Sequence, residues 1–131
     1  MIKGILGKKL GMTQIFEADG TLVPVTVVEA GPCVVLQNKT EENDGYNAVQ
    51  IGFGEIKEKH VNKPMKGFFD KVGQTPVKVV RELRLDQPSD YKIGDKIMAD
   101  VFAAGDLIDA IGVSRGKGFA GTIKRHNFAR G

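Results

Sequence analysis

The chain has very little cysteine, histidine and tryptophan: one cysteine, two histidines and no tryptophan in 131 residues. Cys33 alone cannot form an internal disulfide, and His60 and His126 provide no cluster with the spacing of zinc ligands. We therefore expect no metal, no cofactor and no redox role. Because Cys33 lies in the apolar run 33–36, we expect it to be a small buried core residue.

Long apolar runs are missing as well. No stretch approaches the roughly 20 apolar residues that cross a bilayer, and residues 1–9 lack the continuous apolar segment of a secretory signal. We expect a cytoplasmic protein without a membrane partner. A length of 131 residues, with 41% hydrophobic and 27% charged residues, is typical of one folded domain.

Acidic residues are absent from the last 18 positions. All 16 lie in residues 1–113, where 14 Lys and Arg leave a net charge of −2, whereas residues 114–131 carry +5. A near-neutral body with a basic arm indicates a polyanionic partner. A smaller cluster near the N-terminus also lacks acids. The basic residues of the two segments are Lys3, Lys8, Lys9, Arg115, Lys117, Lys124, Arg125 and Arg130.

The body, residues 1–112, has the pattern of short strands separated by turns. Asp19 and Gly20 are typical of a tight hairpin, and Pro64 with Gly73 predicts a short helix inside an insertion at about 54–76. Strands at about 10-residue spacing with little helix favour a mainly β fold, a small closed or nearly closed β-barrel. The expected strands cover 11–16, 21–29, 33–37, 46–53, 77–85, 96–102 and 107–113.

The insertion is rich in lysine. We interpret its basic side chains mainly as a solvated face, with a second RNA-facing patch as the alternative. His60, which lies among them, is expected to be a surface residue rather than a catalyst. The lysines are Lys57, Lys59, Lys63 and Lys66.

Two enzyme motifs occur near the C-terminal end, and neither has the right context. Residues 112–116 match G-x-S-x-G, but the glycines that follow disfavour the required helix, and no acid follows Asp109. Residues 116–121 match G-x-G-x-x-G, but a dinucleotide site needs a helix at the motif and an acid about 20 residues later. A nucleotide-dependent enzyme is a remote alternative, and we expect no enzyme and no small-molecule substrate.

The arm, residues 113–131, combines features suited to nucleic acid. Its glycines allow close backbone approach to phosphates, its cations neutralise them, and its rings are able to stack on bases. A solvated tail is disfavoured because Phe119, Ile123 and Phe128 are apolar, and docking on an acidic protein is the competing interpretation. Besides the cations named above, the expected contact residues are Gly116, Gly118, Phe119, Gly121, His126 and Phe128.

Several motifs, in order along the whole chain, resemble the bacterial large-subunit ribosomal protein L three family. They lie at 4–16, 25–35, 46–54, 62–64, 114–119 and 124–128. The resemblance implies a Greek-key type, translation-protein-like β-barrel at the surface of the large subunit. From Gly112 onward, it implies an extension that runs through 23S-type ribosomal RNA towards the peptidyl transferase centre.

The same resemblance implies a scaffold with an early role in subunit assembly and no catalytic residue. Its partners would be the large-subunit RNA and neighbouring ribosomal proteins. The family pattern also continues beyond Gly131, where a returning segment completes the barrel.

Overall fold

A long antiparallel β-hairpin begins the described part of the chain. The computed structural model describes residues 4–129, and in it β1 (Gly7–Phe16) pairs with β2 (Leu22–Ala30). The turn is closed by Asp19, whose carboxylate accepts hydrogen bonds from the Thr21 amide at 2.9 Å and hydroxyl at 2.8 Å, while Gly20 takes a φ of 84°. The hairpin predicted from Asp19 and Gly20 is confirmed.

A second antiparallel sheet forms the centre of the body. Its strand order is β5-β4-β3-β6, and β4 pairs with β5 along its whole length. The short helix α1 (Glu41–Asp44) connects β3 to β4. The strands predicted at 33–37, 46–53 and 77–85 are confirmed with slightly shifted bounds, namely β3 (Cys33–Lys39), β4 (Ala48–Glu55) and β5 (Val77–Arg84).

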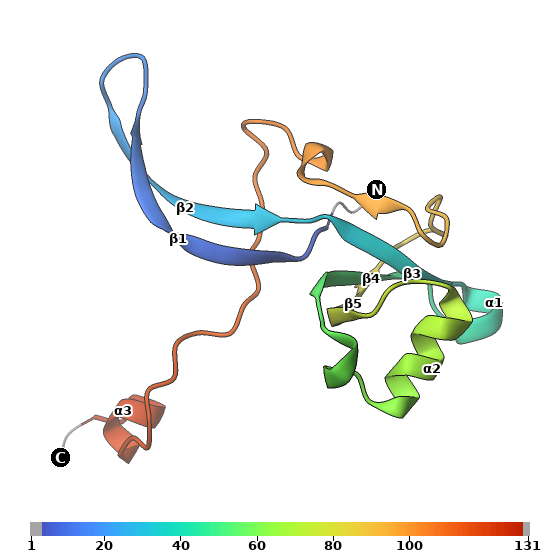
Figure 1. Ribbon diagram of the computed structural model, residues 1–131. Coiled ribbons are helices and arrows are strands. Elements are labelled where there is room, and N and C mark those ends of the chain that lie inside the picture. The colour runs from blue at the N-terminus through green and yellow to red at the C-terminus, as the bar shows by residue number, and fades with distance from the viewer. Residues whose placement is uncertain (1–3, 130–131) are drawn as a thin grey trace.

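The mainly β fold is confirmed, but closure into a barrel is wrong for residues 4–129. The hairpin and the four-stranded sheet remain separate sheets, and Figure 1 shows the hairpin projecting from the body. Of the strand predicted at 96–102 only β6 (Lys96–Ile97) forms, followed by the turn η2 (Ala99–Val101). Residues 107–113 form no strand, because their apolar side chains are exposed and no strand edge pairs with them.

The core lies against the four-stranded sheet. Cys33, as predicted, is fully buried, and its Sγ lies 3.4 Å from the carbonyl oxygen of Leu6, to which it donates. Burial raises the pKa of this thiol. The apolar side chains that form the core cluster are Cys33, Val35, Val49, Ile51 and Ile97.

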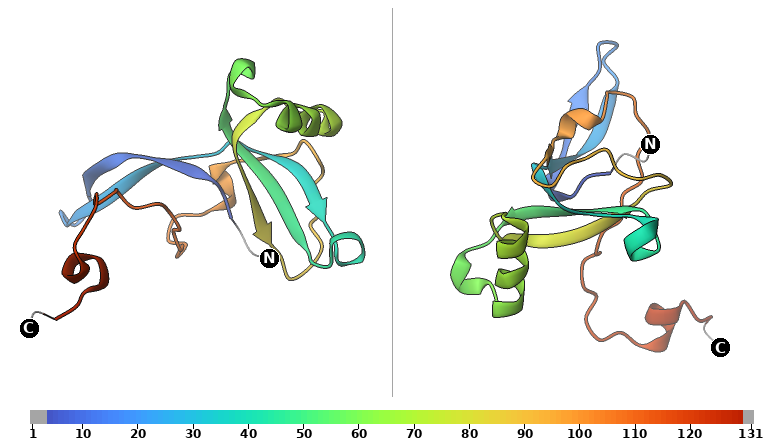
Figure 2. Two further views of the ribbon diagram at one scale, coloured as in Figure 1. Left: turned by 90° about the horizontal axis from the view of Figure 1, so that it is seen from below. Right: turned by 90° about the vertical axis from the view of Figure 1, so that its right-hand side faces the viewer.

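The predicted helix is α2 (Lys63–Val72), which covers one face of this sheet, while η2 lies on the other side (Figure 2). It begins where the Asn62 side chain accepts a hydrogen bond from the Met65 amide at 3.0 Å. It ends at Gly73, which adopts a φ of 73°. Phe69 is its buried anchor.

Candidate nucleic-acid interface

The described part of the basic arm leaves the body as irregular backbone. Figure 1 shows it extending away from both sheets and ending in α3 (Thr122–His126). This single helical turn follows Gly121, whose carbonyl oxygen accepts a hydrogen bond from the Arg125 amide at 2.9 Å, and it stops at Asn127 in the left-handed region. The sequence did not indicate this turn, because the glycines before it disfavour helix.

The cations of the arm face solvent. Arg115, Lys117, Lys124 and Arg125 are exposed, and within residues 4–129 none of them forms an ion pair. Lys124 and Arg125 place positive charge in the last turn of α3, near the end of the helix where the backbone carbonyls are exposed. Arg130 and Lys3 were also predicted contact residues, and they lie outside the described residues.

The predicted aromatic contacts are available to a partner. Phe119 is 101% exposed, so its ring packs on no described residue. The rings of His126 and Phe128 lie 5.7 Å apart at 40°, and Phe128 also faces solvent. Exposed rings on a cationic segment are the elements of a stacking surface for bases.

Of the three glycines predicted to contact a partner, one has a backbone conformation that favours glycine. Gly118 has a φ of 68°, a conformation that side-chain-bearing residues rarely adopt. A Cβ at Gly116 or Gly121 would meet nothing within 4 Å, so these two have open space for an approaching partner.

Lys8 and Lys9 lie on β1, beside a bulge that shifts the register between Lys9 and Gly11. Both side chains are exposed, and Lys8 lines an open groove of about 850 Å³ between the base of the hairpin and the β4–β5 side of the sheet. Within the described residues, no hydrogen bond or ion pair joins either lysine to the arm. The structure therefore presents them as a separate basic position.

The two enzyme-like motifs lack the strands and helices that such motifs need on either side. The strand that would lead into 112–116 does not form, and no helix follows it directly. In 116–121 the helix α3 begins only after the last glycine. Between residues 4 and 129, no three His, Cys, Asp or Glu side chains gather to hold a metal ion, and no described helix has the length and apolarity to cross a membrane.

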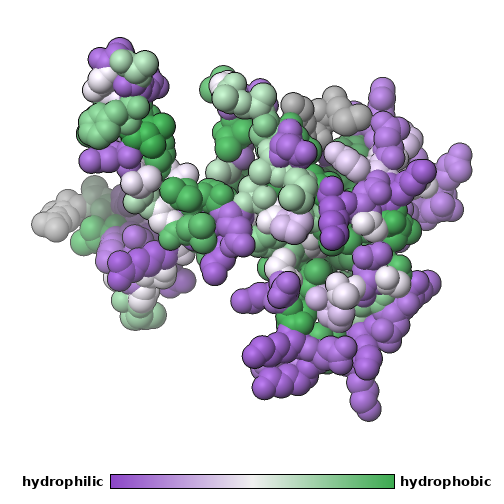
Figure 3. All heavy atoms as spheres, turned by 45° about the horizontal axis from the view of Figure 1, so that its top comes forward, coloured by the Kyte–Doolittle hydropathy of each residue, from purple (hydrophilic) through white to green (hydrophobic). Residues whose placement is uncertain are grey.

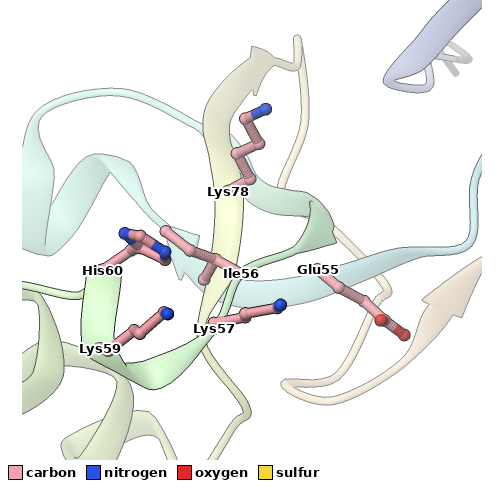
Figure 4. A pocket seen from close by; sticks show the side chains of 6 residues that line it. All are labelled: Glu55, Ile56, Lys57, Lys59, His60 and Lys78. Atoms are coloured by element: carbon pink, nitrogen blue, oxygen red, sulfur yellow. The ribbon is translucent and has the colours of Figure 1, made fainter.

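The sequence indicated an RNA-facing lysine patch in the insertion only as an alternative, and it did not identify the lysine-lined hollow. The hollow has a volume of about 410 Å³ and lies where β4, the turn η1 (Glu58–His60) and β5 meet (Figure 4). Lys57 and Lys59 had been interpreted mainly as a solvated face, with an RNA-facing patch as the alternative, and His60 is exposed as expected. Lys78 had drawn no attention because its proximity depends on the pairing of β4 with β5. The lining residues are Glu55, Ile56, Lys57, Lys59, His60 and Lys78.

A hydrogen-bonded ion pair joins β3 to β5. Lys39 Nζ lies 2.8 Å from Glu82 Oε1 and donates to the Tyr46 hydroxyl at 2.9 Å, and that hydroxyl donates to Glu82 Oε2 at 2.8 Å. Hydrogen bonds from Lys39 and then Tyr46 lower the pKa of Glu82, and Glu82 raises the pKa of Lys39. Arg84 lies over the Tyr46 ring at 4.6 Å. These interactions link the strands of the sheet, and the charges of Lys39 and Glu82 are already paired with each other.

Comparison with known proteins identifies the family. Residues 78–131 match the family described as Ribosomal protein L3. The chain is 58% identical, over all its 131 residues, to large ribosomal subunit protein uL3 of Carboxydothermus hydrogenoformans, and it spans 63% of that protein's length.

Two further relatives carry the same name. The uL3 proteins of Heliobacterium modesticaldum and Desulfitobacterium hafniense are 58% and 57% identical over 129 residues, which cover 98% of this chain and 61% of each relative. Identity at this level along nearly the whole chain establishes common descent, and the chain belongs to the ribosomal protein L3 family.

Proposed function

We propose that this chain is a structural component of the large ribosomal subunit and that it binds large-subunit ribosomal RNA without catalysing a reaction. The observation that carries the proposal is the exposed basic arm, which presents Arg115, Lys117, Lys124 and Arg125 with no acidic residue beside them. The names of the relatives, each a large ribosomal subunit protein, support the same role.

Recognition by the arm follows from its side chains. Arginine and lysine neutralise backbone phosphates, and arginine additionally forms two-pronged hydrogen bonds with them. The exposed Phe119 ring stacks on a base or packs in an RNA groove, and Ile111 and Val113, also exposed, gain a surface to pack on. The irregular backbone lets the arm follow the shape of a folded RNA.

The wider role belongs to the longer protein that the relatives represent. We propose that the chain acts in the cytoplasm within the large subunit, beside neighbouring ribosomal proteins, and that it supports early subunit assembly. In the full-length protein the arm would continue towards the peptidyl transferase centre, where the RNA carries out the chemistry.

Deleting residues 114–131 tests the proposal. Binding to large-subunit ribosomal RNA is measured by filter retention from about 50 to about 200 mM salt, and each phosphate contact adds about 0.7 to 0.9 to the log–log slope. The deletion should remove most of the salt-sensitive binding, while cooperative unfolding of the body changes little. Unaltered RNA affinity after deletion, or arm-dependent binding only to an acidic polypeptide such as polyglutamate, would contradict the RNA-binding role.

A further inference from the structure

The hollow between β4, η1 and β5 carries a cluster of positive charge with few compensating acids. Figure 4 shows Lys57, Lys59 and Lys78 around it with His60, and Glu55 as its single acidic lining residue. Within residues 4–129 none of the three lysines forms an ion pair. Like charges gathered in one place repel one another, and a bound anion relieves this repulsion.

The backbone holds these side chains in place. Glu55 pairs with Val77, which brings the end of β4 beside Lys78, and the preceding residue Gly54 has a φ of 80° within the strand. The amide of His60 donates to the carbonyl of Lys57 at 2.9 Å, which closes η1. The capped start of α2 at Asn62 then fixes the other end of the turn. The lysines therefore extend from a fixed frame, unlike the cations of the irregular arm.

We propose that this hollow is a second RNA contact, a preformed site for the phosphate backbone of a ribosomal RNA segment other than the one that the arm binds. The inference rests on the RNA-binding function proposed above. Ile56 is the only aliphatic lining residue, whereas protein interfaces usually bury a larger apolar centre, so the chemistry favours a polyanionic backbone.

The hollow lies far from the end of the basic arm. Figures 1 and 2 show η1 well apart from α3 in every view. Figure 3 shows hydrophilic side chains gathered at the lower right, where η1 and α2 lie in Figure 1, and a mixture of hydrophilic and hydrophobic ones along the projecting hairpin. One chain would thus hold two RNA segments at separate positions, which suits a protein that stabilises an RNA fold.

The test compares two triple variants of the 131-residue chain with equal charge loss. K57Q/K59Q/K78Q removes the three lysine charges that line the hollow, and K63Q/K66Q/K71Q removes three exposed lysines of α2 that do not line it. The probe is 23S-type ribosomal RNA transcribed in vitro. The hollow variant should lower the salt slope by about 2 to 3 and the α2 variant by less than about 1. Arginine at the three hollow positions should restore the slope.

Hydroxyl-radical footprinting locates the contact. The hollow variant should lose protection of nucleotides that remain protected in an arm variant, R115Q/K117Q/K124Q/R125Q. Equal effects of the two triple variants, or an unchanged footprint with the hollow variant, would overturn the inference. Loss of binding to polyglutamate while RNA binding is retained would assign the hollow to an acidic protein instead.

Failure of the inference and failure of the proposed function give different results. If the arm variant loses RNA affinity and the hollow variant does not, only the second contact is wrong. If the unmodified chain binds the RNA without salt dependence, the proposed function itself is wrong.

Discussion

Phe69 anchors α2 to the central sheet, and its truncation tests how the body is held together. It is 1% exposed, and it is the only buried residue of this ten-residue helix. A helix of this length is marginal in water without tertiary contacts. Phe69→Ala removes the apolar contact and leaves a cavity, at a cost of about 3–5 kcal/mol in unfolding free energy.

Urea unfolding followed by far-ultraviolet circular dichroism measures this loss. Met65→Ala on the same helix is the matched control, because Met65 is 38% exposed and its truncation should cost about 1 kcal/mol or less. A loss below about 1 kcal/mol for Phe69→Ala, or equal losses for the two variants, would refute the anchoring role. Because η1 directly precedes α2, a Phe69→Ala chain that still folds should also bind RNA less tightly.

Three further predictions address packing, pH and recognition. A Cβ at Gly52 would lie 2.5 Å from Val77 Cγ2, so Gly52→Ala should lower the unfolding free energy by about 1–3 kcal/mol in urea. The hydrogen bond from Lys39 lowers the pKa of Glu82, so the ionised Glu82 stabilises the fold above the ordinary pKa of a glutamate, and this stabilisation is lost as the pH falls through the lowered pKa. In Glu82→Gln, the midpoint of urea unfolding should therefore fall less steeply as the pH is lowered. Phe119→Ala should leave thermal unfolding unchanged but weaken RNA binding, measured by filter retention, by about 1–3 kcal/mol; unchanged binding would exclude stacking.

Local signals in the sequence predicted much of the fold. Asp19 and Gly20 determine their turn through short-range hydrogen bonds and a positive φ, so the hairpin was predictable. Pro64 and Gly73 likewise set the two ends of α2. The charge contrast between body and arm, too, depends only on composition.

Non-local pairing accounts for what the sequence did not reveal. Residues 107–113 have an apolar pattern suited to a strand, but a strand also needs a neighbouring edge, and none of the described residues supplies one. The hollow depends on the register that pairs Glu55 with Val77. This pairing brings Lys78 beside η1, although the two are far apart in the chain. The sequence spacing alone does not indicate that Lys78 and η1 lie side by side.

The most direct test of RNA binding by the arm is a crosslink from the arm inside an assembled subunit. A tagged chain with a photoreactive amino acid at position 119 is expressed in cells, large subunits are purified at high salt, and the crosslinked species are identified by sequencing and mass spectrometry. Because Phe119 is fully exposed, the substitution should not disturb the body. We expect crosslinks to large-subunit ribosomal RNA; crosslinks to protein alone, or a chain absent from the large-subunit fraction, would contradict RNA binding by the arm.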